Sequence, residues 1–329
     1  MGIRFFIPFI LTCALGGRLL TADVVLAKEP RHSQQNDSRN QAPSPLSANS
    51  PAWETAAGGK MQFDVASVKP DVSDVAPSSN FVIDSSDAFV PTGGLFSGAN
   101  WPLFRYVVFA YKLDSLQSAA IRSQLPKWAT TDRYDIQARA TGNPTKDQFR
   151  LMVQDLLMVR FKLSLHFESH QMPTLALVPV KPGEFGERLR LHVDNPPCDA
   201  HAVATYPFKV LPTGFPEVCG VVVPLRPKAV GIAAGEGARD VSLTQIAHAF
   251  SVPGLTNLGR PVIDGTGLTG KYDFLIEWNP TPGPDASPET QTGPTFLEAL
   301  KDQLGLKLVP STGLITTVII DHIEQPLEN

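Results

Sequence analysis

The sequence lacks the short motifs that mark many nucleotide-binding and hydrolytic enzymes. It contains no P-loop, no G-x-S-x-G nucleophile elbow and no H-E-x-x-H zinc motif. Strong charge of either sign is also missing, since 28 Lys and Arg stand against 32 Asp and Glu, for a net charge of −4. Nucleic-acid-binding proteins usually carry a basic face, so we expect no nucleic-acid partner. The residues point to no catalytic centre, no metal site and no cofactor.

Long apolar runs are scarce as well, and the one candidate lies at the N-terminus. Arg4 precedes the run FFIPFILTCALGG, which is short for a bilayer span, and small residues follow up to Ala27. This pattern predicts a secretory signal peptide over residues 1–27, with an uncleaved anchor as the alternative. Thr12 before Cys13 is a poor lipobox residue and argues against a lipoprotein. We therefore expect an exported protein, periplasmic or extracellular, with no integral membrane span after cleavage.

Cysteine is rare, with three in 329 residues. Removal of the signal peptide leaves Cys198 and Cys219, and an isolated pair in an oxidising compartment usually forms a disulfide. Two free thiols are one alternative. The other is a metal site that includes His192, Asp194 and His201, although neither cysteine lies in a C-x-x-C spacing. The disulfide is the prediction.

Residues 28–60 are polar and rich in Ser, Asn, Gln and Pro. Such a segment buries too little apolar area to offset its ordering entropy, so we expect a disordered linker. The folded part begins near Phe63, where FDVASV alternates as a strand until Lys69 and Pro70 end it. The 30 prolines and 25 glycines predict frequent turns and a β-containing fold.

The chain passes twice through a similar series of predicted elements. Helices are expected over 102–113, 145–160 (capped by Thr145), 241–252 (capped by Ser242) and 295–305. Three pairs of segments align: Tyr134-Asp135-Ile136 with Tyr272-Asp273-Phe274, 161–163 with 306–308, and 175–178 with 318–321. We predict an α+β fold of two similar modules, 61–195 and 196–329. Each is a small mixed sheet with two helices, roughly βαββαββ.

The stretch GTGLTG (265–270) satisfies the G-x-G-x-x-G pattern of dinucleotide-binding folds. That fingerprint requires a helix directly after the glycines, because its N-terminal amides bind the pyrophosphate. Here KYDFLIEW follows, in which aromatic and apolar residues alternate with period two, as in a strand. We therefore interpret the motif as a connection between strands whose glycines adopt positive φ angles.

The segment HFESH (166–170) is the strongest candidate for metal chemistry. On a strand, His166, Glu168 and His170 share one face and could hold zinc. A solvated strand face is the simpler interpretation. His248 on an apolar helix and His322 on the last strand have the same ordinary interpretation.

Three carboxylates in the second half could form an acid–base pair, but their positions are ordinary ones. Asp264 precedes a glycine in a turn, and Asp273 and Glu277 lie on the polar face of a predicted strand. These positions alone require no catalysis.

Six stretches together resemble a family of exported proteins from soil bacteria that share a C-terminal domain of unknown function. They are FDVASVKP (63–70), FAYKL (109–113), LPKWATTDRYDIQARA (125–140), and the stretches 150–181, 259–278 and 300–329. The motif residues are Phe63, Lys69, Pro70, Trp128, Tyr134, Asp135, Asp264, Gly267, Gly270, Tyr272 and Asp273. The resemblance implies export and a repeated domain, but no activity and no catalytic residues. The element order of each module is also similar to the short N-terminal domains of secretins and TonB-dependent receptors, which are interaction modules.

The absence of a catalytic constellation favours a non-catalytic exported protein that binds a protein or another envelope component. Exposed strand edges are one way to accept such a partner. A sensor that holds a small ligand between the modules is an alternative, and a pocket at their junction would favour it. A metal-dependent hydrolase that uses the His166, Glu168 and His170 face, or the 192–219 loop, is a further alternative.

Overall fold

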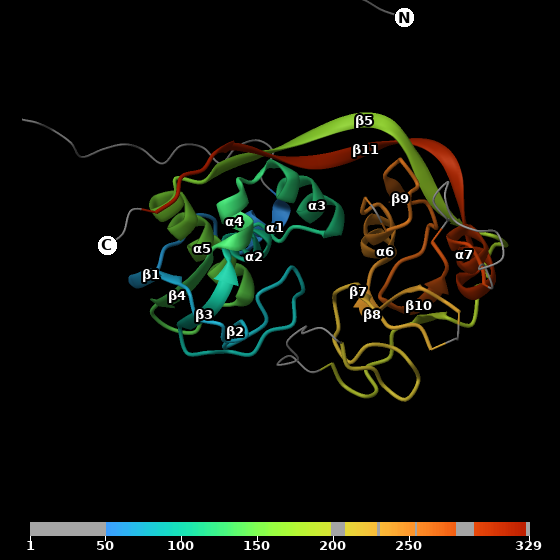
Figure 1. Ribbon diagram of the computed structural model, residues 1–329, viewed down its shortest axis with the longest axis horizontal. Coiled ribbons are helices and arrows are strands. Elements are labelled where there is room, and N and C mark those ends of the chain that lie inside the picture. The colour runs from blue at the N-terminus through green and yellow to red at the C-terminus, as the bar shows by residue number, and fades with distance from the viewer. Residues whose placement is uncertain (1–50, 199–207, 229–230, 254, 281–292, 327–329) are drawn as a thin grey trace, which may run out of the picture. The chain divides into compact units, whose positions relative to one another are not determined.

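The computed structural model describes residues 51–198, 208–228, 231–253, 255–280 and 293–326 (Figure 1). These belong to one compact unit, Leu46–Asn329. The predicted signal peptide, most of the predicted linker and His201 lie outside the described residues. Among the described helices, none combines the length and apolar character that crossing a bilayer requires.

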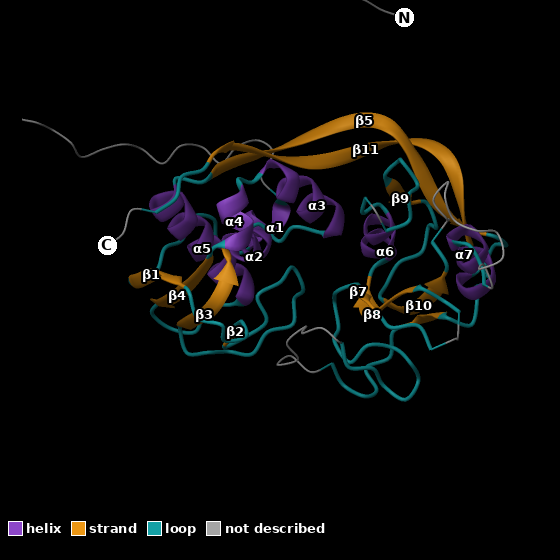
Figure 2. Cartoon of the chain, in the orientation of Figure 1, coloured by secondary structure: helices purple, strands orange, loops and turns teal. Residues whose placement is uncertain are grey.

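The first half contains a four-stranded antiparallel sheet with the order β1-β4-β3-β2. Helices pack against this sheet around one hydrophobic core, and Figure 2 shows these helices in purple beside the strands in orange. The elements are α1 (Ala52–Ala56), β1 (Val65–Asp71), β2 (Ser78–Ser79), β3 (Leu95–Pro102), α2 (Leu103–Ala110), α3 (Ser115–Gln124), α4 (Lys127–Thr131), β4 (Arg133–Arg139) and α5 (Lys146–Phe161).

The second half contains a sheet of the same design, β6-β10-β8-β7, again antiparallel throughout. The elements are β6 (Leu189–Leu191), β7 (Val223–Pro224), β8 (Ala234–Val241), α6 (Leu243–Phe250), β9 (Val262–Asp264), β10 (Tyr272–Trp278) and α7 (Phe296–Leu304). The series β3–α2–β4–α5 corresponds to β8–α6–β10–α7. We call these series, each with the strand that follows it, the first and second repeat. The α+β class is confirmed, and the first repeat carries more than the two helices expected.

Two long strands end the repeats and join them. β5 (Ser164–Pro179) pairs with β11 (Leu306–His322) in antiparallel fashion along almost their whole lengths, and β9 adds in parallel beside β5 (Figure 1). The sequence pattern predicts two strands in each region, 161–169 and 174–181, and 306–311 and 316–323. This division is wrong, because each region forms one continuous strand. Pro173 and Pro310 do not interrupt the pairing, because a strand with a free outer edge tolerates a missing N–H group.

Each long strand contributes to both hydrophobic cores. Phe167 near the start of β5 packs on the first core, whereas Leu177 near its end is fully buried in the second. β11 does the reverse, with Leu306 in the second core and Val318 in the first. The repeats therefore exchange the ends of their last strands.

The module boundary after residue 195 does not match this packing. Leu189, on the N-terminal side of that boundary, is buried in the second core, and β6 pairs with β10. The expected linker also extends too far, because α1 begins at Ala52 and its Glu54 is buried. Lys69 and Pro70 do not end the first strand but lie within β1, where Pro70 is tolerated because β1 forms an edge of the sheet.

The helix ends show why local signals worked for the helices. Thr145, Ser242 and Thr295 each form a capping box with the residue three positions later. At the other end, Lys162 and Gly305 have left-handed backbones after α5 and α7. These two residues are equivalent, so the alignment of 161–163 with 306–308 is wrong by two positions, while that of 175–178 with 318–321 keeps this register.

The Tyr-Asp pairs of the two repeats have a common structural role. Asn100 on β3 and Asp240 on β8 both have positive φ angles, at irregularities in the strand pairing. Asp135 Oδ1 accepts a hydrogen bond from the Asn100 N–H at 2.9 Å, and Asp273 Oδ1 accepts one from the Asp240 N–H at 3.2 Å. Each aspartate therefore stabilises a bulge in the neighbouring strand.

The GTGLTG segment connects β9 to β10, and no helix follows it. Gly267 and Gly270 have the expected positive φ angles, 70° and 102°. Gly265 does not. A Cβ atom there would lie 3.1 Å from Ala176 Cβ and 3.3 Å from Leu177 O, so a side chain at this position would crowd β5. The connection also passes from one sheet to another, since β9 pairs with β5 rather than with β10.

Candidate functional site

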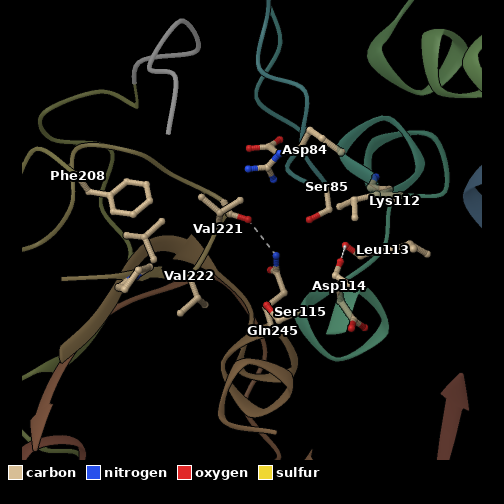
Figure 3. Close-up of a pocket in the computed structure, with 16 residues that line it drawn as sticks. Asp84, Ser85, Lys112, Leu113, Asp114, Ser115, Phe208, Val221, Val222 and Gln245 are labelled. Atoms are coloured by element: carbon tan, nitrogen blue, oxygen red, sulfur yellow. Dashed lines mark hydrogen bonds between the residues drawn. The ribbon is translucent and has the colours of Figure 1, made fainter. Parts of the chain in front are cut away.

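A cavity of 420 Å³ lies where α2 and α3 face the second repeat. Its volume falls in the range of small-molecule sites. In Figure 3, Val221, Val222 and Gln245 lie on one side, and Asp84, Ser85 and Asp114 lie on the other. We call it the Arg105 cavity; its lining is Asp84, Ser85, Arg105, Val108, Lys112, Leu113, Asp114, Ser115, Ser118, Phe208, Gly220, Val221, Val222, Val223, Pro224 and Gln245.

The two carboxylates of the Arg105 cavity already have partners. Asp84 Oδ1 accepts a hydrogen bond from Lys146 Nζ at 2.9 Å. Asp114 caps α3, and its other oxygen lies 2.7 Å from His248 Nδ1 on α6, which ties the two repeats together. Neither acid is therefore available to bind a cation without losing a native contact.

The two cations of the cavity differ from each other. Lys112 Nζ is paired with Asp87 at 2.6 Å. Arg105 takes part in no ion pair with another described residue, and its guanidinium carbon lies 5.3 Å from the centre of the Trp101 ring. Burial lowers the pKa of the Arg105 guanidinium, and the nearby Asp84 acts in the opposite sense. The cavity thus presents one partly desolvated, unpaired positive charge.

The predicted face His166, Glu168 and His170 does come together on β5. Glu168 accepts a hydrogen bond from each histidine, at 3.0 and 2.8 Å, and His166 Nδ1 lies 2.8 Å from Asp321 on β11. All four side chains are exposed, between 40% and 63%. Hydrogen bonds to Glu168 and then to Asp321 raise the pKa of His166. An imidazole with both nitrogens already hydrogen-bonded is a poor metal ligand.

The other predicted candidates have structural partners. Cys198 and Cys219 form the predicted disulfide, with Cα atoms 5.8 Å apart. His192, Asp194 and Cys198 place ligand-type atoms within 4.8 Å of one another, but the disulfide removes the thiolate that a metal would need.

The carboxylates of the second half are also engaged. Asp264 accepts hydrogen bonds from the backbone and hydroxyl of Thr266, as a turn residue does. Glu277 is bonded to Arg188 at 2.8 Å and to the N–H of Lys228 at 2.8 Å. Asp273 is buried between Arg190 and His192, at 3.3 and 2.6 Å. These contacts bring no pair of carboxylates together for acid–base work.

The remaining motif residues support the fold. Phe63 packs on Phe96 and Trp128 stacks on Phe161. Tyr134 is buried in the first core, and the Tyr272 hydroxyl donates to the Thr269 carbonyl at 3.1 Å.

The residues of the Arg105 cavity were not predicted from the sequence. One signal was present: Arg105 is the single charged residue in the apolar helix LFRYVVFA. The other lining residues come from α2, α3, β7, α6 and the loops between them, so their meeting depends on the packing of the two repeats. Local sequence patterns therefore do not predict which residues line this cavity.

Fold and cavity define a two-repeat α+β protein whose repeats share a pair of long strands. The family model described as "Protein of unknown function (DUF3738)" matches residues 105–323, and the chain belongs to this family. The match covers the first repeat from Arg105 of α2 onward and the whole second repeat, to the end of β11. Searches of curated proteins and of solved structures gave no match. The expected C-terminal domain of unknown function is therefore confirmed.

Proposed function

We propose that this protein is a non-catalytic exported binding protein that holds a small anionic ligand in the Arg105 cavity. The observation that carries the proposal is the partly buried Arg105 guanidinium, which lacks an ion-pair partner among the described residues while both carboxylates of the cavity are engaged. Binding energy is available there, because a charge-assisted hydrogen bond gains strength in a partly desolvated site.

The rest of the lining defines the class of ligand. Val108, Val222 and Phe208 supply apolar surface, while Ser115 and Gln245 supply polar atoms. A carboxylate with a short apolar chain satisfies both parts: its oxygens pair with Arg105 in a bidentate fork, and its chain contacts the valines. Such a ligand bridges the two repeats, which is the arrangement expected of a sensor or a carrier.

Export is supported by two features. The N-terminal residues have the pattern of a signal peptide, and the Cys198–Cys219 disulfide is typical of oxidising compartments. We therefore place the ligand outside the cytoplasm, among the components of the cell envelope or its surroundings.

We expect linear monocarboxylates from acetate to octanoate to raise the melting temperature increasingly with chain length. At a ligand concentration 100-fold above Kd, binding stabilises the folded state by about 2.7 kcal/mol, a shift of several degrees. Arg105→Gln should abolish the shift, and Val222→Trp should do so by filling the cavity. Differential scanning fluorimetry measures the melting temperatures of native protein and of both variants with each carboxylate. Inorganic phosphate serves as a second type of anion.

Arg139→Gln is the matched control, because Arg139 is an exposed arginine on β4 outside the cavity. It should respond to each carboxylate as the native chain does. Equal shifts in native and Arg105→Gln protein, or no shift with any probe at millimolar concentration, would refute the anion site. Circular dichroism confirms that each variant is folded.

The hydrolase alternative rests on one observation, the contact among His166, Glu168 and His170. We expect dialysed protein to take up less than one equivalent of zinc, because Glu168 and Asp321 already occupy both nitrogens of His166. Mass spectrometry for metals before and after His166→Ala measures this. Stoichiometric zinc that is lost in the variant would favour the hydrolase over the binding protein.

A further inference from the structure

The Cys198–Cys219 disulfide has a histidine, His192, beside it. Cys198 is partly exposed, while Cys219 is buried with 7% of its surface accessible. His192 Nε2 lies 3.8 Å from Cys198 Sγ. The side chain of His192 is 11% exposed, so the imidazole is held against the sulfur with little access for water.

The other face of His192 is fixed by a buried carboxylate. Asp273 Oδ1 lies 2.6 Å from His192 Nδ1, and Asp273 is 1% exposed. Arg190 pairs with the second oxygen of Asp273 at 3.3 Å. Asp273 therefore orients His192 with Nε2 toward the sulfur. Sulfur, imidazole and carboxylate lie in a row, as in the nucleophile–base–acid arrangement of thiol chemistry.

We propose that Cys198–Cys219 is a redox-active disulfide that accepts two electrons from an external dithiol, and that His192 stabilises the Cys198 thiolate which results. This adds a thiol–disulfide exchange site to the binding protein and does not depend on the Arg105 cavity. The substrate class is a small or protein-borne dithiol.

The exchange is balanced in atoms and charge. A thiolate of the dithiol attacks the more exposed sulfur, Cys198 Sγ; the Cys198–Cys219 bond breaks, and Cys219 leaves and takes a proton. The second thiolate of the dithiol then attacks its own sulfur in the mixed disulfide and releases Cys198. The dithiol ends as a cyclic disulfide, oxidised by two electrons. Cys198 remains as a thiolate, and the second proton resides on His192.

The other charged groups around Cys198 have opposite effects on the stability of a Cys198 thiolate. Asp194, which is exposed, accepts a hydrogen bond from the Cys198 N–H at 2.8 Å and disfavours a thiolate. Arg239, which is buried, donates to the Pro196 carbonyl on the same loop and favours one. His192 contacts the sulfur itself, so we expect its effect to dominate over the exposed Asp194.

The test uses Cys219→Ser in the full chain, in which Cys198 is a free thiol, and follows iodoacetamide alkylation of the Cys198 peptide against pH by mass spectrometry. An ordinary thiol gives a midpoint near pH 8.5. We expect a midpoint at least one pH unit lower, and His192→Asn in the same background should return it toward the ordinary value. His322→Asn, an exposed histidine on β11, is the control.

A second measurement needs no cysteine variant. Native and His192→Asn proteins, both oxidised, are reduced with dithiothreitol in the presence of a chelator, and Cys198 is quantified by alkylation at each time. We expect Cys198 to be released from the mixed disulfide with dithiothreitol several-fold more slowly in His192→Asn, since Cys198 is the leaving thiolate of that second step and loses its partner. An ordinary alkylation midpoint, a midpoint unchanged by His192→Asn, or equal reduction rates would each overturn the proposal. Far-ultraviolet circular dichroism verifies that all variants are folded.

Discussion

Glu236→Gln should remove a steep pH dependence of stability. Glu236 on β8 lies opposite Ile276 of the second core, is 6% exposed, and its Oε2 has no hydrogen-bond partner among the described residues. Burial raises the pKa of Glu236 from an ordinary 4.5 to about 8. The folded protein therefore keeps a proton on this carboxyl that the unfolded chain loses above about pH 4.5.

The sign of the effect follows from this difference in bound protons. Between pH 4.5 and about 8 the folded state binds the extra proton, so the free energy of unfolding falls as pH rises, by about 1.4 kcal/mol per pH unit. Below pH 4.5 the buried carboxyl makes its full contribution to the free energy of unfolding, and above about pH 8 that contribution has been lost. Glutamine carries no titrating group, so the variant should gain several kcal/mol relative to native protein at pH 8.

Urea unfolding at half-unit steps from pH 4.5 to 8.5 measures the effect. Glu187→Gln is the control, because Glu187 is exposed in the segment before β6; its stability curve should run parallel to that of the native protein. Parallel curves for native and Glu236→Gln protein would show that the buried carboxyl is not neutral. The effect is separate from the ligand site, since Glu236 does not line the Arg105 cavity.

Glu236 also shows where prediction from the sequence failed. β8 reads AGEGARDV, in which glycines and charges dominate, and no strand was predicted there. The strand forms because β7 and β10 flank it on both edges. Its residues are buried by these neighbours rather than by their own hydrophobicity, which is information that a local window does not contain.

Local signals succeeded where the determining contacts are a few residues apart. The caps of α5, α6 and α7 depend on three-residue spacings. Those of α5 and α6 were predicted at Thr145 and Ser242, and α7 was predicted as a helix starting at 295. α3 was missed although Asp114 and Gln117 form the same type of box. Its face is only weakly apolar, so the periodic signal was faint.

The repeat was visible in the sequence, but the exchange of strands was not. Tyr134-Asp135 and Tyr272-Asp273 identified equivalent strands because each aspartate must satisfy the same bulge. Continuity of β5 through Pro173 depends on pairing with residues near Thr312, about 140 positions away. The disulfide could be predicted because only two cysteines follow residue 27. The His192–Asp273 pair beside it could not, because that contact depends on the pairing of β6 with β10.

Asp84→Ala should be among the most destabilising single substitutions in the first repeat. Lys146 is 4% exposed and Asp84 is 8% exposed, and their side chains are 2.9 Å apart. Burial lowers the pKa of Lys146 to about 8, with Asp84 opposing the decrease, so the ammonium is still charged at pH 7. Loss of one partner of a buried pair leaves an uncompensated charge and costs about 3–5 kcal/mol.

A double-mutant cycle at pH 7 separates the pair from its surroundings. Lys146→Met in the Asp84→Ala background removes the orphaned charge, so the double variant should be clearly more stable than Asp84→Ala alone. Asp87→Ala is the matched control three residues away; its side chain is 73% exposed, and we expect a loss below about 1 kcal/mol. Urea unfolding of native protein, Asp84→Ala, Lys146→Met and the double variant completes the cycle, with Asp87→Ala measured beside them. Equal losses for Asp84→Ala and Asp87→Ala would contradict the buried-pair account.

The same pair has a consequence for ligand binding. Asp84 and Ser85 line the Arg105 cavity, and Lys146 holds their loop by also donating to the Ala88 carbonyl at 3.0 Å. Asp84→Ala therefore releases one wall of the cavity and frees a second cation close to Arg105. If the anion proposal holds, variant protein that remains folded should lose selectivity for chain length while keeping its affinity for phosphate. Titrations of native and Asp84→Ala protein with octanoate and with phosphate compare the two affinities. An unchanged preference for octanoate would show that this wall does not shape the site.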